Sequence, residues 1–208
     1  VVTLGTGLTQ QPKLIISKVT NTAADWPVFA NGFDTTDYIL LNTSAAKVNH
    51  SSDLWNLSNW SNTTFGCHRD MYGTSNTVIA YCFHDVTGYQ KIGTYTGNGS
   101  ANGEFIETGF EPAFVMIKRT DSSANWRILD NKRSLSNPRN KELYPNLANA
   151  EGTYSAINFF SNGFQNISTD ASYNASGGTY LYLAIAADPD QTDPTVENSF
   201  DVATYTGN

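Results

Sequence analysis

The chain has 208 residues, a formal net charge of −7 and a sequence pI near 4.8. Such an acidic chain offers no basic patch for phosphates or for an anionic membrane surface, so we expect neither nucleic acid nor membrane insertion. The first residues, VVTLGTGLTQQ, lack the basic and apolar regions of a signal peptide, so we expect a soluble chain made without one.

The composition and the spacing of apolar residues predict an all-β fold. Charged residues make up only 15% of the chain, whereas Asn occurs 22 times and Gly 16 times, as in turns and loops. No segment keeps a 3.6-residue apolar spacing for three helical turns. Short apolar segments between turn residues instead predict antiparallel strands in a sandwich. In chain order these segments are LIIS (14–17), WPVF (26–29), YILL (38–41), VIAYCF (78–83), FVMIK (114–118), WRIL (126–129), YLYLAIA (180–186) and FDVATY (200–205).

An internal repeat organises these segments. Pro12, Lys18 and Trp26 each recur 100 positions later, and VIAYCFH at 78–84 matches YLYLAIA at 180–186 with an offset of 102. Self-similarity at such a period indicates repeated structural units, and loop insertions would account for the drift of the offset. We therefore predict two tandem antiparallel β-sandwich repeats of jelly-roll type.

The ends of the chain suggest that the repeat continues. TYTGN occurs twice without change, at 94–98 and 204–208, and the opening VVTLGTG resembles a degenerate form of IGTYTGNG. We expect a segment of a longer array, and the alternative is a two-copy protein with a swapped terminal strand. The predicted divisions are a first repeat at 1–92, a second repeat at 93–190, and a connector with the first strand of a following repeat at 191–208.

The two copies also indicate which residues form the core. Strand alternation places Ile79 and Tyr81 on one face, and large residues recur at both counterparts. Cys82 is replaced by alanine in the second copy, which favours a small packed residue over a reactive thiol. Trp26 and Trp126 occupy one repeat position, so we expect equivalent buried tryptophans in two separate cores.

Candidate catalytic groups are present, but no pairing of them is evident. A glycosidase needs two carboxylates on facing strands, and most acidic residues here lie beside turn residues, where Asp usually caps its own backbone. Glu104 and Glu107 cannot share a strand face at a spacing of three. There is no Gly-x-Ser-x-Gly motif. We therefore expect no enzyme. The carboxylates considered are Asp34, Asp37, Asp53, Asp70, Glu104 and Glu107.

Metal and cofactor sites are not expected either. Cys67 and His68, with Cys82 and His84, could supply zinc ligands on neighbouring strands, but the usual Cys-x-x-Cys spacing is missing and the second copy has alanines at 184 and 186. The acidic stretch DPDQTDPTVEN lacks the Asp-x-Asp-x-Asp-Gly pattern of a calcium loop, and its prolines favour a stiff connector.

One pair of loops has the residue types that bind sugars. Proteins bind sugars with an aromatic face against the C–H groups, and with amides and carboxylates for the hydroxyls. The loops SSDLWNLSNWSNTT and HRDMYGTS offer Trp60, Asn59, Asn62, Asp70 and Tyr72. Trp60 has no counterpart in the second copy, so either glycan contact or subunit packing would explain it. Under both readings Trp60→Ala should weaken adsorption or assembly and leave stability nearly unchanged.

The strings GYQKIGTYTGNGS, TGFEPAFVMIKRTDSSANWRILDNKR, FFSNGF and NASGGTYLYLAIA resemble a repeat of tail-fibre and related virion proteins from marine and cyanobacterial phages. The resemblance covers nearly the whole chain and is most specific from 88 to 133. It implies a lectin-like or laminin-G-like β-sandwich, repeated along a fibre, and attachment to a host surface. The segment NLANAEGTYSAINFF departs from the pattern of that family, so we expect loops in the second half to serve a different purpose.

Three functions follow as hypotheses. The first is a non-enzymatic structural and adhesion module of a phage tail fibre or related virion appendage, contributing to attachment to host-surface glycan. The second is a capsid or tail decoration protein, and the third is a glycan-cleaving tailspike domain. The first implies a virion location, and its expected partners are copies of the chain in a homo-oligomer, other virion proteins and a host glycan.

Overall fold

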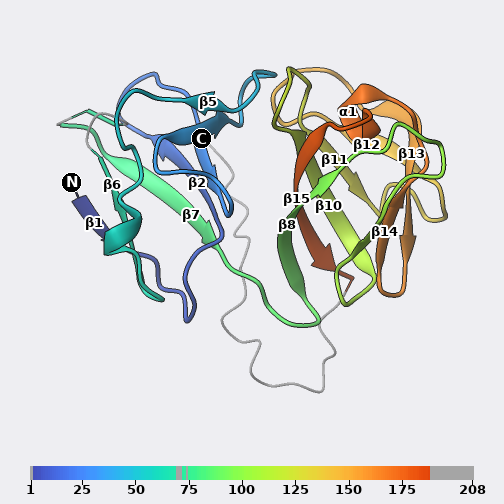
Figure 1. Ribbon diagram of the computed structural model, residues 1–208, viewed down its shortest axis with the longest axis horizontal. Helices are drawn as coiled ribbons and strands as arrows, with labels where there is room; N and C mark the ends of the chain where they lie inside the picture. The colour runs from blue at the N-terminus through green and yellow to red at the C-terminus, as the bar shows by residue number, and fades with distance from the viewer. Residues whose placement is uncertain (1, 69–71, 74, 188–208) are drawn as a thin grey trace, which may run out of the picture.

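The structure is a computed structural model that describes residues 2–68, 72–73 and 75–187 (Figure 1). It is almost entirely β, as the sequence predicts, with one short helix, α1 (Ala171–Asn174), and one 3-10 turn, η1 (Leu57–Asn59). The strands are β1 (Val2–Gly5), β2 (Leu14–Val19), β3 (Pro27–Ala30), β4 (Asp37–Leu40), β5 (Val48–Asn49), β6 (Thr64–Cys67), β7 (Val78–Phe83), β8 (Gln90–Thr96), β9 (Phe105–Glu107), β10 (Pro112–Arg119), β11 (Arg127–Asp130), β12 (Arg139–Leu143), β13 (Gly152–Phe160), β14 (Gly163–Asn166) and β15 (Thr179–Ala186).

The strands form three antiparallel sheets in two lobes. In the first lobe, a five-stranded sheet has the order β5-β4-β3-β2-β7, and β1 pairs with β6 in a separate ribbon. In the second lobe, an eight-stranded sheet has the order β8-β15-β10-β11-β12-β13-β14-β9 and curls toward a barrel (Figure 1). Its end strands, β8 and β9, are not paired with each other, which leaves an opening on one side.

The strand registers follow the repeat. Leu14 of β2 lies opposite Phe83 of β7, and 100 and 102 positions later Phe114 of β10 lies opposite Ile185 of β15. Both pairs have the same register because the spacing of apolar residues fixes which residue can face the core. Cys82 lies opposite Ile15 as its counterpart alanine lies opposite Val115, so the cysteine occupies a packed strand position.

The opening of the chain corresponds to a different strand from the one expected. The string IGTYTGNG, which VVTLGTG resembles, begins within β8, but β8 pairs with β15. The opening strand β1 pairs with β6, as β9 pairs with β14. Gly7 and Gly109, both with positive φ, follow these two strands. The opening is therefore the counterpart of ETGF at 107–110. Strand pairing identifies this equivalence, whereas a match between short polar strings does not.

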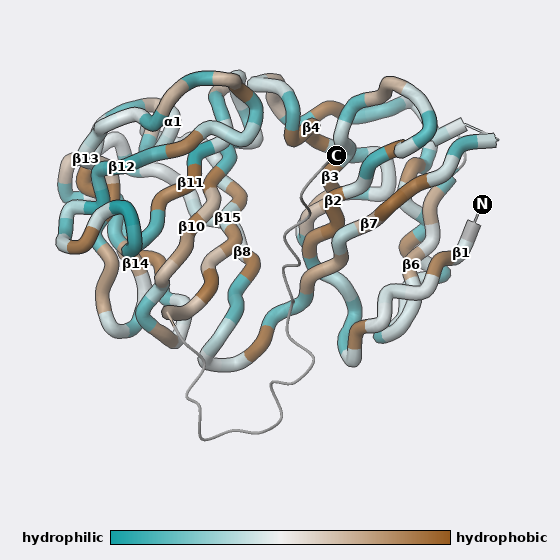
Figure 2. Tube along the Cα trace, turned by 180° about the vertical axis from the view of Figure 1, so that it is seen from behind, coloured by the Kyte–Doolittle hydropathy of each residue, from teal (hydrophilic) through white to brown (hydrophobic). Residues whose placement is uncertain are grey.

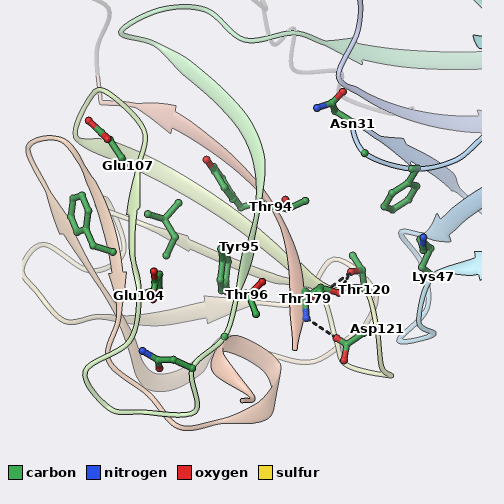
Figure 3. A pocket seen from close by; sticks show the side chains of 17 residues that line it. Asn31, Lys47, Thr94, Tyr95, Thr96, Glu104, Glu107, Thr120, Asp121 and Thr179 are labelled. Atoms are coloured by element: carbon green, nitrogen blue, oxygen red, sulfur yellow. Dashed lines mark hydrogen bonds between the residues drawn. The ribbon is translucent and has the colours of Figure 1, made fainter. Parts of the chain in front are cut away.

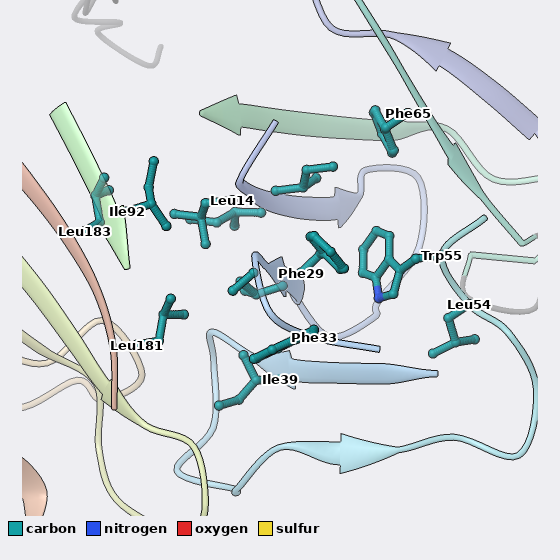
Figure 4. Packing of buried hydrophobic residues seen from close by; sticks show 14 of the residues in the cluster. Leu14, Phe29, Phe33, Ile39, Leu54, Trp55, Phe65, Ile92, Leu181 and Leu183 are labelled. Atoms are coloured by element: carbon teal, nitrogen blue, oxygen red, sulfur yellow. The ribbon is translucent and has the colours of Figure 1, made fainter. Parts of the chain in front are cut away.

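The two lobes share one hydrophobic core, which corrects the expectation of two separate cores. Leu14 and Ile16 of β2 belong to the same cluster of buried residues as Met116, Leu181 and Leu183 of the second lobe. Figure 4 shows Leu181 and Leu183 pointing toward the strands of the first lobe. Figure 2 shows the hydrophobic strands of both lobes along their boundary. Each sheet has apolar residues on both of its faces. The face that is not covered within its own lobe is removed from water by packing against the corresponding face of the other lobe.

A second cluster fills the curled sheet of the second lobe. Tyr95 of β8 stacks on Tyr180 of β15, with ring centroids 4.7 Å apart, and Phe164 of β14 packs edge-on against both Tyr95 and Tyr182. These residues alternate along their strands with residues of the shared core, as expected for strands that are buried on both faces.

The same local corner occurs in both lobes. Lys118 Nζ donates to the carbonyl of Ala124 at 2.6 Å, and the backbone N–H of Trp126 donates to an asparagine side chain at 3.0 Å. In the first lobe, Lys18 Nζ donates to the carbonyl of residue 24 at 2.6 Å, and the N–H of Trp26 donates to an asparagine side chain at 3.0 Å. The repeat therefore specifies the local conformation as well as the strand.

The environments of the two corners differ, so the two tryptophans are not equivalently buried. Trp126 is 1% exposed, and its Nε1 donates to the carbonyl of Leu40 in the other lobe at 2.8 Å. Lys118 also donates to the carbonyl of Ser44 at 3.0 Å. Trp26 is only partly buried, beneath Lys18 Nζ at 5.8 Å from its ring centroid. The second corner thus makes hydrogen bonds to the other lobe, whereas the bonds of the first corner are all within its own lobe.

Candidate functional site

An open cavity of about 910 Å³ lies between the lobes, beside the opening of the curled sheet (Figure 3). Asn31 and Lys47 of the first lobe line one side, and residues of β8 and β9 line the other. The lining is about equally polar and apolar. It consists of Asn31, Gly32, Phe33, Lys47, Thr94, Tyr95, Thr96, Gly97, Asn98, Glu104, Phe105, Ile106, Glu107, Thr120, Asp121, Thr179 and Tyr182.

The wall from the first lobe is held by an ion pair. Lys47 Nζ donates to the buried carboxylate of Asp37 and lies 5.3 Å from the ring centroid of Phe33. Burial raises the pKa of Asp37, but hydrogen bonds from Lys47, from the N–H of Asp34 and from Asn49 outweigh it and leave the pKa below its ordinary value. The ammonium of Lys47 is therefore held at the cavity by a carboxylate that stays ionised.

A second carboxylate held by hydrogen bonds, that of Asp121, also lines the cavity. Asp121 accepts two hydrogen bonds from the guanidinium of Arg119, both 3.0 Å, and one from the N–H of Thr179 at 3.0 Å. The hydrogen bonds from Arg119 lower the pKa of Asp121, against a smaller opposing effect of burial. The hydroxyls of Thr120 and Thr179 lie 2.8 Å apart beside it. This part of the lining presents hydroxyls and a satisfied carboxylate.

The wall from the second lobe carries the free polar groups. Alternation along β8 turns Tyr95 into the core and leaves Thr94 and Thr96 exposed. Phe105 of β9 and Glu104, the residue before β9, line the same cavity, and Phe105 is 45% exposed. An exposed ring beside hydroxyls and a carboxylate suits a ligand that has both apolar and hydroxyl-bearing faces.

Glu104 and Glu107 both line this cavity, although their spacing places them on opposite sides of a strand. Glu107 accepts a hydrogen bond from the side chain of Asn162 at 3.0 Å. Figure 3 shows the two carboxylates at separate positions along the wall. Glu104 precedes β9, which begins at Phe105, so the alternation of side chains along the strand does not apply to it.

Two of the residues proposed from the sequence line a neighbouring cavity of about 510 Å³. Trp60 and Asn62 face Gln10 and Gln11 across it. The turn at 31–33 lines both cavities, so the two form adjoining parts of one surface. Gly32 has a φ of 90° in this turn, a conformation that a side chain would strain.

Trp60 is also part of the packing of the first lobe. Its ring lies 4.6 Å from that of Phe29 and 6.0 Å from that of Phe65, and its Nε1 donates to the carbonyl of Gly66 at 2.9 Å. The expectation that Trp60→Ala leaves stability nearly unchanged is therefore corrected, because these contacts would be lost. A tryptophan without a counterpart in the repeat signals only a difference between the copies.

The other proposed residues are not gathered around Trp60. Asn59 is exposed and lines neither cavity, and its carbonyl accepts a hydrogen bond from Thr64. Tyr72 is 8% exposed, lines a separate cavity and donates its hydroxyl to Ser17 Oγ at 2.7 Å. Burial raises the pKa of Tyr72. Asp70 lies outside the described residues, as does the acidic stretch from 188 that was considered for calcium.

Most of the larger cavity cannot be predicted from the sequence. Of its lining residues, Glu104 and Glu107 stand out only as candidate catalytic carboxylates, and the repeated TYTGN string forms part of one wall. Asn31, Lys47 and Phe105 carry no sequence signal. Within the described residues, no three His, Cys, Asp or Glu side chains are grouped as for a metal ion.

The cysteines considered as zinc ligands are both free thiols in packed positions. Cys67 is buried, and burial raises the pKa of its thiol. Burial also raises the pKa of Cys82, to about 11. Both groups therefore remain protonated near neutral pH, which makes them poor nucleophiles.

Comparison with protein families assigns the chain to one of them. Residues 1–189 match the family described as Domain of unknown function (DUF7483). The chain belongs to the DUF7483 family. The match spans both lobes and therefore includes the cavity between them. No curated protein and no solved structure matches the chain. In the part of this DUF7483 chain that the structure describes, no helix has the length and apolar character needed to cross a bilayer.

Proposed function

We propose that this DUF7483 chain is a non-enzymatic structural and adhesion module of a phage tail fibre or related virion appendage. In this proposal it binds host-surface glycan in the cavity between its lobes. The resemblance of its repeat strings to virion proteins supports the virion setting, with copies of itself and other virion proteins as partners. The two repeats at 1–92 and 93–190 would be tandem sandwich units whose second faces have become a shared core.

The observation that carries the proposal is the exposed wall of β8 and β9. Thr94, Thr96 and Glu104 can exchange hydrogen bonds with sugar hydroxyls, and the exposed ring of Phe105 can cover the apolar face of a pyranose. Lys47 on the opposite wall, paired with Asp37, adds hydrogen-bond donors for further hydroxyls. The cavity is open, so it can admit an internal stretch of a polysaccharide as well as an end.

Phe105 offers a test with a matched control. Its neighbour Phe160 is 41% exposed, with its ring centroid 6.0 Å away, but does not line the cavity. Binding of purified host polysaccharide is measured by calorimetry and by saturation-transfer NMR. We expect Phe105→Ala to weaken binding about ten-fold, as loss of 1–2 kcal/mol implies, and Phe160→Ala to leave it nearly unchanged. Equal effects of both variants, or no binding by the unchanged chain, would reject the proposal.

A second candidate is a glycan-cleaving tailspike domain, because Glu104 and Glu107 line the same cavity. Glycoside hydrolysis needs two carboxyl groups roughly 5 to 10 Å apart on either side of the bond. Release of reducing ends from host polysaccharide, abolished in both Glu104→Gln and Glu107→Gln, would replace adhesion with hydrolysis. Glycan binding without release of reducing ends would favour adhesion.

A further inference from the structure

Strand β7 ends its sheet with an edge that lacks the usual protection. Among the described residues, β7 pairs only with β2. Its sequence, VIAYCF, has no charged residue and no proline, the devices by which natural edge strands avoid further pairing. By contrast, the edge strand β8 carries Lys91. The edge of β7 is therefore suited to receive another strand.

The repeat shows what covers this edge in the other copy. The counterpart of β7 is β15, and β8 pairs along it over seven residues, from Thr179 opposite Thr96 to Ile185 opposite Gln90. The opening strand β1 pairs with β6, so it does not occupy the equivalent place on β7. The first lobe thus lacks a strand of the β8 type.

The side chains of β7 are more exposed than their counterparts on β15, which face the shared core and also have β8 beside them. Leu181 and Leu183 of β15 are 2% and 5% exposed, and Ile92 of β8 packs in the same cluster. Their counterparts on β7, Ile79 and Tyr81, are 42% and 39% exposed. A strand laid along β7 would place side chains directly beside Ile79 and Tyr81, so it would be stabilised by cross-strand side-chain contacts as well as by backbone hydrogen bonds.

The chain contains a second segment of the β8 type. TYTGN at 94–98, which begins in β8, recurs unchanged at 204–208, and the residues before it, FDVA, keep an apolar residue at 202 where β8 has Ile92. We propose that residues 200–206 add to the free edge of β7 in the same chain and complete the first sheet, as β8 completes the second. The inference does not depend on the proposed function.

The connection is long enough to reach. Six residues, 84–89, carry the chain from β7 across the boundary to β8 (Figure 1). The N–H of Ala186, at the end of β15, donates to the carbonyl of Tyr89 at 2.8 Å, so β15 ends beside this same crossing. Thirteen residues separate Ala186 from Phe200, and they span up to about 40 Å, twice what six residues span.

The register of β8 on β15 fixes the register expected on β7. Leu183 lies opposite Ile92 and Leu181 opposite Thr94, which places Val202 opposite Tyr81 and Thr204 opposite Ile79. A neighbouring position such as Ala203 points to the other face of the strand. The proposal therefore predicts which pairs of positions can be joined by a disulfide.

The test uses the full chain with Cys82→Ala, the residue found at the counterpart position in the second copy. Tyr81→Cys with Val202→Cys places two thiols on directly opposite positions, within the Cα separation that a disulfide accepts. We expect mild oxidation to join them within one monomer at least about ten-fold faster than it joins the control, Tyr81→Cys with Ala203→Cys. Peptide mapping identifies the bond, and circular dichroism confirms that both variants fold.

Two further outcomes make the test decisive. Single variants with Tyr81→Cys and Val202→Cys, tagged at different sizes and mixed, should give no joined heterodimer, and a heterodimer would show that the strand comes from a second copy. Equal rates for the test and control pairs would show that no strand docks in this register. As an independent measurement, Ala203→Pro removes a backbone donor and should speed amide exchange of β7 about ten-fold or more, whereas unchanged exchange would overturn the proposal.

Discussion

Replacing each repeat tryptophan by alanine tests how the lobes are joined. Trp126 is fully buried and donates to the carbonyl of Leu40 in the first lobe. Emptying a core aromatic site costs about 3–5 kcal/mol, and the lost hydrogen bond adds about 1 kcal/mol, so we expect Trp126→Ala to lower the free energy of unfolding by about 4–6 kcal/mol. Trp26 is only partly buried, so we expect Trp26→Ala to cost about 1–2 kcal/mol.

Urea unfolding followed by circular dichroism measures both values. Trp126→Phe serves as a control that retains an aromatic ring but loses the hydrogen bond, and we expect a cost of about 1–2 kcal/mol. Costs within about 1 kcal/mol of each other for Trp126→Ala and Trp26→Ala would refute the shared core, because two separate lobes would treat the two residues alike.

Three further outcomes follow from packing and charge. We expect Trp60→Ala to lower the free energy of unfolding by about 2–3 kcal/mol in urea denaturation, because its ring packs on Phe29 and its Nε1 donates to a carbonyl. Gly163→Ala should cost more than about 3 kcal/mol in the same assay, because the added Cβ would lie 2.1 Å from the carbonyl oxygen of Ile106. Burial lowers the pKa of Lys118 to about 8, so between pH 8 and about 10.5 the unfolded chain holds a proton that the folded chain has released, and stability should rise with pH. Relative to Lys118→Met, the unchanged chain should gain about 2 kcal/mol across this window, and a flat difference would refute the shift. The raised pKa of Cys82, about 11, makes the free energy of unfolding fall with pH above pH 9. Both chains contain Cys82, so this effect cancels in the comparison.

The candidate site shows how little of a cavity can be found from residue types. Trp60 stood out because it has no counterpart in the repeat, yet its ring is held mainly by Phe29 and Phe65. Thr94 and Phe105 did not stand out, because threonine and phenylalanine are ordinary strand residues. They form a wall only because the curled sheet stops short of closing between β8 and β9.

The sequence by itself determined the β class and which strands recur in the two copies, because alternation of apolar residues is local and the two copies report it twice. The hydrogen bonds around Lys18 and Lys118 are equally local and recur for the same reason. Tertiary structure decided which apolar faces meet. Only the way the two lobes pack together buries Trp126 against Leu40 while Trp26 stays partly exposed, and it forms the cavity between Lys47 and β8. Such contacts join residues that are distant in the sequence, and no local pattern specifies them.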